Sequence, residues 1–178
     1  MKRAYIVTLA AVGAMLVADG PPQAEAARSV SPFASAPETQ ARIARIVQAR
    51  NSVLSDAESL RIGRAVARSA ARHGLDPDLV TAVLIVESGA RPWARSGKGA
   101  VGLMQVMPHM VRQMSLAGNL ATVEANVEAG CAILADNIAR LGEDDGISAY
   151  FWGSNIRGVA YLDRVRAARA ALRQSSES

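Results

Sequence analysis

The sequence predicts an all-α fold organised as one compact helical domain, and three observations support this prediction. Beyond residue 37, apolar positions recur every three or four residues, as they do on one face of a helix. No window alternates apolar and polar residues in the manner of a half-buried strand. Helix-capping residues and glycines bracket several of the periodic segments. A length of 178 residues is typical of one domain, and a hydrophobic content of 50% is enough for a packed core.

The first residues carry the pattern of an export signal. Lys2 and Arg3 precede an uncharged apolar run over residues 4–18, and a polar stretch then leads to an A-x-A sequence at residues 24–26. This three-part pattern is typical of a secretory signal peptide, whereas a membrane anchor needs about 20 apolar residues. We therefore expect a signal peptide over residues 1–26, a mature chain without a membrane span, and a location in the periplasm.

A linker and a short helix are expected over residues 27–54. Residues 28–37 contain two prolines and several small residues, as linkers do. Ile43, Ile46 and Val47 then share one face of a helix.

The next two helices have clear start and stop signals. Residues 55–58 form a capping box that opens a helix, and Gly74 ends it. Asp76 and Pro77 supply a cap and a first-turn proline for the following helix, which Gly89 closes.

The remaining segments continue the helical pattern after a glycine-rich loop. We expect, in order, a loop over residues 91–103, a short helix from Pro108, a long helix over 123–141, a helical segment near 147–152, an arginine-rich helix over about 161–173, and a polar tail over 174–178. The helical domain is therefore expected to span residues 55–173.

Composition excludes some classes of function and leaves others open. A single cysteine excludes a disulfide scaffold. The net charge of +4 fits an anionic partner, whether a cell envelope, a membrane surface or nucleic acid. A stripe of arginines on one helix is better explained as a solvated face than as a nucleic-acid surface, because a secreted chain rarely meets nucleic acid. His73 and His109 lack metal-ligand spacing, so we expect no metal site.

Glu87 stands where a glutamate is unfavourable for stability. It shares the apolar face of Val80, Val83 and Leu84, and it lies in the last turn, where the helix dipole disfavours negative charge. Both effects raise the pKa of the carboxyl, and a general acid must be kept protonated in this way. The alternatives are that the side chain turns outward at a fraying helix end, or that it pairs with Arg91 or Arg95.

The segment after Glu87 suits a polar ligand. Gly99, Ala100 and Gly102 allow the backbone to approach a ligand closely, and the Gln105 amide can both donate and accept hydrogen bonds. Such a loop beside a buried acid fits a hydroxyl-rich sugar better than an apolar ligand.

Residues 87–108 resemble the lytic transglycosylase family whose fold is that of goose-type lysozyme. The family pattern of E-S, a variable loop and S-x-x-G-A-x-G-L-M-Q-x-M-P is present at the family spacing. An N-x-x-x-G match follows at residues 126–130, and Tyr150 opens a partial match to Y-N-x-G, in which Phe151 replaces the usual asparagine. The resemblance covers roughly residues 76–166.

The resemblance implies cleavage of peptidoglycan between N-acetylmuramic acid and N-acetylglucosamine, with formation of 1,6-anhydromuramyl ends and without a cofactor. It implies that Glu87 is the catalytic acid and that these residues bind the glycan: Ser96, Gly102, Gln105, Met107, Asn126, Tyr150 and Tyr161. Asn126 is almost as well explained by a structural role, and Tyr161 by a place in the core.

Other functions stay open at this point. A hydrolytic muramidase on the same fold would need a second group to position water, and Phe151 leaves room for an inactive glycan-binding scaffold. A nucleic-acid-binding function would require that residues 1–26 are not a signal peptide. The short gap between Tyr150 and Tyr161 resembles small specialised transglycosylases that serve secretion, conjugation or flagellar assemblies.

Overall fold

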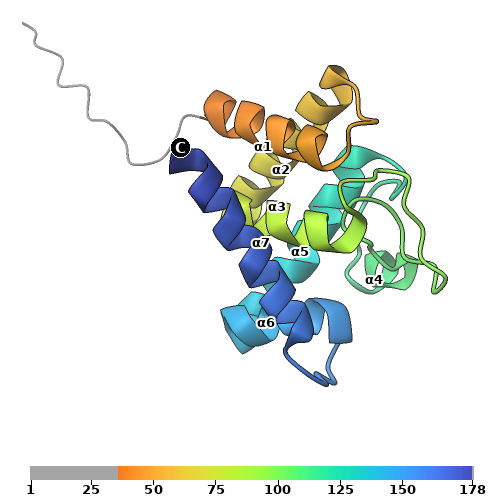
Figure 1. Ribbon diagram of the computed structural model, residues 1–178. Helices are drawn as coiled ribbons and strands as arrows, with labels where there is room; N and C mark the ends of the chain where they lie inside the picture. Colours follow the sequence, from red (N-terminus) through yellow and green to blue (C-terminus); the bar gives the residue numbers. More distant parts are fainter. Residues whose placement is uncertain (1–35, 178) are drawn as a thin grey trace, which may run out of the picture. The chain divides into compact units, whose positions relative to one another are not determined.

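The computed structural model describes residues 36–177, which form helices without any strand (Figure 1). The helices are α1 (Ala36–Arg50), α2 (Asp56–His73), α3 (Pro77–Ser88), α4 (Pro108–Gln113), α5 (Val123–Leu141), α6 (Glu143–Trp152) and α7 (Ala160–Glu177). The predicted all-α class is confirmed for this part of the chain. The expected signal peptide over residues 1–26 lies outside the described residues. None of the described helices is long and apolar enough to cross a bilayer.

The best-defined helix ends follow the capping residues in the sequence. At the start of α2, the Ser55 hydroxyl accepts from the Glu58 backbone N–H at 3.2 Å, and the Glu58 carboxylate accepts from the Ser55 N–H at 2.9 Å. At the start of α3, Asp76 accepts from the backbone N–H of Asp78 at 2.8 Å. Gly89 ends α3 in the left-handed conformation, with φ of 60°.

Three boundaries differ from the sequence-based prediction. Helix α1 begins at Ala36, inside the expected linker. Pro37 therefore lies in the first turn of the helix, where a proline is tolerated because no intrahelical hydrogen bond needs its N–H. Helix α6 begins at Glu143, before the expected segment, and its three acidic first-turn residues are favourable at the positive end of the helix dipole. Helix α7 runs to Glu177, so most of the expected polar tail is helical, since no glycine or proline interrupts it.

The core lies between α2, α3 and α5, with α1, α6 and α7 packed around these three helices. Ile62, Val80 and Leu134 are fully buried there. Leu103 and Met104, which precede α4 in the connection from α3, are also fully buried. This connection is therefore anchored in the core, and its neighbouring residues are held in fixed positions at the surface.

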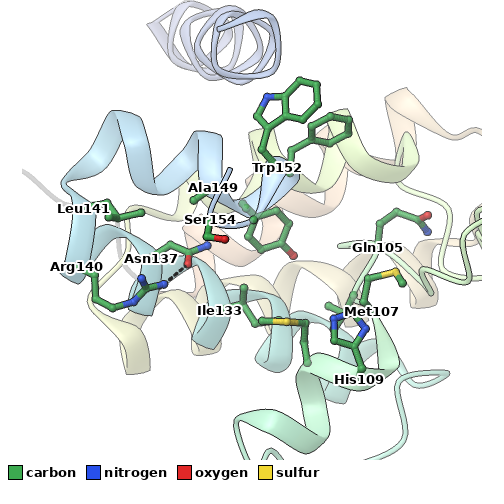
Figure 2. Close-up of a pocket in the computed structure, with 15 residues that line it drawn as sticks. Gln105, Met107, His109, Ile133, Asn137, Arg140, Leu141, Ala149, Trp152 and Ser154 are labelled. Atoms are coloured by element: carbon green, nitrogen blue, oxygen red, sulfur yellow. Dashed lines mark hydrogen bonds between the residues drawn. The ribbon is translucent and has the colours of Figure 1, made fainter. Parts of the chain in front are cut away.

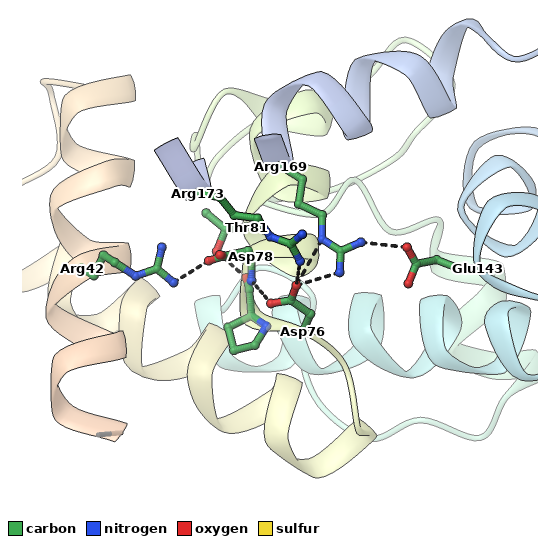
Figure 3. Close-up of polar contacts among 8 residues, drawn as sticks. Arg42, Asp76, Asp78, Thr81, Glu143, Arg169 and Arg173 are labelled. Carbon is green, nitrogen blue, oxygen red and sulfur yellow. Dashed lines mark hydrogen bonds and ion pairs between the residues drawn. The ribbon is translucent and has the colours of Figure 1, made fainter. Parts of the chain in front are cut away.

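An ion-pair network holds α7 against the start of α3 (Figure 3). Asp76 accepts from Arg169 at 2.7 Å and from Arg173 at 2.8 Å, and Arg169 also pairs with Glu143 of α6 at 2.7 Å. Burial alone would raise the pKa of Asp76, but the hydrogen bonds from the two arginines and from a backbone N–H lower it below its ordinary value. The network sets the position of α7 along α3, and these two helices carry the central residues of the site described next.

Candidate active site

Glu87 lies in the last turn of α3 and lines a cleft of about 910 Å³. One wall is formed by the connection between α3 and α4, and the other by the end of α6 and the residues that follow it. The lining residues are Glu87, Ser96, Gly97, Lys98, Ala100, Gln105, Met107, Tyr150, Phe151, Trp152 and Arg157. The structure thus brings the predicted acid together with Ser96, Gln105, Met107 and Tyr150 at one cleft.

The carboxyl of Glu87 has a specific hydrogen-bond donor. The Tyr161 hydroxyl, at the start of α7, donates to Glu87 Oε1 at 2.6 Å. Burial raises the pKa of Glu87, while this hydrogen bond and the positive charge of Arg164 lower it by less, so the net shift is upward. Burial and the neighbouring Glu87 charge raise the pKa of Tyr161 as well, so its hydroxyl stays a donor. The expected direction of the Glu87 pKa shift is confirmed.

The outward-turned alternative for Glu87 is not observed. Within the described residues its carboxyl makes no ion pair, and Arg91 of the following loop donates instead to the backbone oxygen of Ser88 at 2.7 Å. Tyr161 is 1% exposed, so it is a core aromatic that also contacts the acid. Of the two interpretations of Tyr161 that the sequence left open, the structure shows the place in the core: Tyr161 is not among the residues that line the cleft, and its hydroxyl contacts the acid.

A stack of aromatic rings packs against Tyr161, the donor of this hydrogen bond. The ring of Phe151 stacks on Tyr161, with centroids 4.9 Å apart and an interplanar angle of 15°. The edge of Trp152 meets Phe151, again at 4.9 Å between centroids. Sequence reasoning missed the contact with Tyr161, for which the three consecutive aromatic residues ending α6 were the only signal. Phe151, the departure from the family pattern, therefore forms part of the wall beside the acid.

Hydrogen bonds within the loop fix the opposite wall. Gln105 adopts a left-handed conformation with φ of 47°, and its Nε2 donates to Gly102 O at 2.9 Å and to Ala94 O at 3.2 Å. The amide oxygen is then the group with which Gln105 can accept a hydrogen bond from a ligand. The Ser96 hydroxyl accepts from the Ala100 N–H at 3.0 Å. The Tyr150 hydroxyl crosses from α6 and donates to Met104 O at 2.8 Å, which joins the two walls.

Two predicted binding residues lie behind the cleft and not in it. Asn126 of α5 is 1% exposed, and its side chain accepts from the Met104 N–H at 2.9 Å and donates to Val101 O at 2.7 Å. Gly102 has φ of 78°, and a Cβ there would lie 2.3 Å from Asn126 Nδ2. Neither residue is among those that line the cleft. Asn126 supports the loop from inside, because its amide groups are used by the backbone.

The second half of the N-x-x-x-G motif has a related role. A Cβ on Gly130 would lie 2.4 Å from the sulfur of Met104, which is itself fully buried. The motif on α5 therefore provides the surface on which the loop packs, with one polar and one steric contact.

The cleft continues into a second cavity of about 390 Å³ (Figure 2). The two share Gln105, Met107 and the three aromatic residues at the end of α6. The second cavity extends along α5, past Ile133 to Asn137, whose side-chain oxygen accepts from Arg140 at 2.7 Å. A groove that runs on past the acid suits an extended ligand. In the part of the chain that the structure describes, no group of three or more His, Cys, Asp or Glu could hold a metal ion.

Replacing Phe151 with alanine is expected to lower the pKa of Glu87. Without the ring, water reaches the Tyr161–Glu87 hydrogen bond, and the burial that raises the pKa is weakened. A carbon-detected NMR titration of the Glu87 carboxyl measures this change. Trp152→Ala is the control, because Trp152 lines the same cleft and has no ring contact with Tyr161. An unchanged pKa in Phe151→Ala would contradict the shielding role.

The comparisons of this sequence with protein families and with curated proteins both find transglycosylases. The model of the transglycosylase SLT domain matches residues 64–164. A transglycosylase of Enterobacteria phage PRD1 is 35% identical over 91 residues, which cover 51% of this chain and 34% of that protein. An endo-type membrane-bound lytic murein transglycosylase A of Klebsiella pneumoniae is 37% identical over 78 residues, or 38% of each chain.

Among solved structures, an inactive mutant of the lytic transglycosylase Slt from Pseudomonas aeruginosa aligns with a TM-score of 0.45 and 22% sequence identity. The alignment covers 74% of this chain and 27% of that chain. The chain thus spans about a third of the length of the curated relatives described above. The matched range, residues 64–164, includes every residue that lines the cleft.

Proposed function

This chain belongs to the transglycosylase SLT domain family, whose model matches more than half of it, and from this we propose that it is a peptidoglycan lytic transglycosylase. The observation that carries the proposal is a single half-buried carboxylic acid, Glu87, at the wall of an extended groove, with its pKa raised and a tyrosine hydroxyl on one oxygen. This is the form that a general acid takes.

In the first step, Glu87 donates its proton to the glycosidic oxygen between N-acetylmuramic acid and N-acetylglucosamine. The bond from C1 to that oxygen breaks, and its electron pair stays on the oxygen. Tyr161 already donates to Oε1, so Oε2 carries the proton that is transferred. The acetamido carbonyl of the muramic acid residue stabilises the positive charge at C1.

In the second step, Glu87 acts as a base. Its carboxylate takes the proton of the C6 hydroxyl, and the C6 oxygen forms a bond to C1. The product is a 1,6-anhydromuramyl end, the acid is restored, and no water is consumed. Among the described residues Glu87 is the one carboxylate lining the cleft, whereas hydrolysing glycosidases ordinarily use two. This supports the non-hydrolytic reaction over a muramidase.

The products of digestion test this proposal. Purified peptidoglycan treated with the protein should yield fragments with anhydro ends, which mass spectrometry identifies because each is lighter than a reducing end by one water. A hydrolytic lysozyme, run in parallel, provides reducing ends for comparison. Reducing ends alone would identify a muramidase, and intact strands that still bind the protein would identify an inactive scaffold.

We further propose that the enzyme acts in the periplasm, on the support of the expected signal peptide. The connection between α6 and α7 covers only residues 153–159, which supports assignment to the small specialised enzymes. Such an enzyme would open the peptidoglycan locally for an envelope-spanning secretion, conjugation or flagellar assembly.

A further inference from the structure

Two basic side chains line the cleft without an anionic partner of their own. Lys98 comes from the connection between α3 and α4, and Arg157 from the connection between α6 and α7, so each wall contributes one. Neither makes an ion pair with any other residue in the range 36–177. Other exposed arginines differ in this respect: Arg61 pairs with Glu124 at 2.7 Å and Arg72 with Glu128 at 2.8 Å, whereas Arg45 and Arg64 make no ion pair within the described residues.

The cleft itself does not neutralise these charges. Its one carboxyl belongs to Glu87, so two positive side chains in the lining face at most one negative charge. The nearby Arg164 adds a further positive charge, which interacts electrostatically with Glu87. The potential in the cleft is therefore positive, and it favours a ligand that brings its own negative charge.

We propose that Lys98 and Arg157 bind a carboxylate of the substrate, and that this contact distinguishes peptidoglycan from neutral glycans. The inference rests on the proposed function, since it assumes that the substrate is peptidoglycan. The two sugars of peptidoglycan differ in whether they carry a carboxyl group. N-acetylmuramic acid carries a lactyl ether whose carboxyl is free in bare strands and amide-linked in strands with peptide stems, and the stems have carboxylates of their own. N-acetylglucosamine carries none.

The chemistry of the two side chains fits this ligand. A guanidinium presents a planar pair of donors that matches a carboxylate, and an ammonium on a flexible stem acts as a point charge. Both side chains are exposed, so salt screens their contribution. The contact therefore contributes to selectivity and to capture of the strand more than to total affinity.

The test compares Lys98→Gln/Arg157→Gln with the control Arg45→Gln/Arg64→Gln, which removes the same charge from exposed residues of α1 and α2 outside the cleft. Both pairs are placed in a Glu87→Gln background, so that binding is measured without cleavage. The ligands are stem-bearing strands, amidase-treated bare strands and a neutral N-acetylglucosamine oligomer. The cleft variant should lose about five- to tenfold in affinity at low salt for carboxylate-bearing strands, and the loss should shrink as salt is added.

The two possible sources of the carboxylate give different results. A loss on bare strands assigns the contact to the lactyl carboxyl, and a loss confined to stem-bearing strands assigns it to the stem. Unchanged affinity for both kinds of strand, or an equal loss on the neutral oligomer, would overturn the inference. Because binding is measured without turnover, failure of this inference is separable from failure of the proposed reaction, which would appear as absent anhydro products from the unmodified protein.

Discussion

Glu87→Gln is expected to reduce cleavage of peptidoglycan by about a thousandfold or more, because the amide has no proton of suitable acidity to give to the glycosidic oxygen. The substitution keeps the size of the side chain, and its oxygen can still accept the hydrogen bond from Tyr161. Release of soluble fragments from purified peptidoglycan measures the effect. Asp145→Asn, which alters an exposed carboxylate of α6 outside the cleft, should leave the rate unchanged. Activity within tenfold of the unmodified protein would refute the assignment of the acid.

The same variant should be more stable than the unmodified protein at neutral pH. The pKa of Glu87 in the folded state lies above its ordinary value of 4.5, so the folded protein retains a proton that the unfolded chain releases. The free energy of unfolding therefore falls as the pH rises from about 4.5 to the folded pKa, and this loss is complete above it. Glutamine does not titrate. The stability advantage of Glu87→Gln in urea unfolding should thus be present at pH 7 and vanish below the ordinary pKa.

Asn126→Ala is expected to destabilise the protein by about 3 kcal/mol, since it leaves the buried Met104 N–H without a partner and removes one of the two hydrogen bonds that the Val101 carbonyl accepts. It also removes the bond from Asn126 Nδ2 to Leu120 O at 3.1 Å. Urea unfolding followed by circular dichroism measures the change. Activity should fall as well, because the loop that Asn126 supports carries Ser96 and Gln105 into the cleft.

Asn119→Ala is the control for this prediction. Asn119 lies just before α5 and is exposed, and its side-chain oxygen accepts one backbone hydrogen bond, from Ala121 at 2.9 Å. Its loss should cost less than about 1 kcal/mol. Equal stability losses in the two variants would show that burial of the Asn126 amide is not what matters.

Much of the helical architecture was predictable, because it depends on neighbouring residues. The capping box at Ser55 and the Asp76–Pro77 pair mark where α2 and α3 begin, since a cap satisfies backbone donors within three residues of itself. The start of α6 and the end of α7 differ from the sequence-based prediction, because the sequence has no comparable signal at either boundary. Gly142 opens α6 without a side-chain cap, and residues 174–177 are polar and yet continue α7.

The acid of the candidate site was also accessible from the sequence. Glu87 interrupts an apolar helix face, and this conflict between residue type and position is visible without coordinates. The environment of Glu87 could not be predicted from the sequence. The hydroxyl on its carboxylate comes from Tyr161, 74 residues further along the chain, and the ring above that tyrosine is Phe151.

The two motifs that contain Gly102 and Asn126 show the same division between local and tertiary information. Periodicity and caps put Asn126 on a helix and Gly102 in a loop, and nothing local shows that the amide fills the space beside that glycine. Nor does any pattern show that Lys98 and Arg157 line one cleft. Local backbone preferences act over three or four residues and can be seen in the order of amino acids. Contacts between distant segments depend on how the helices pack, so those side-chain neighbours appear only once the chain is folded.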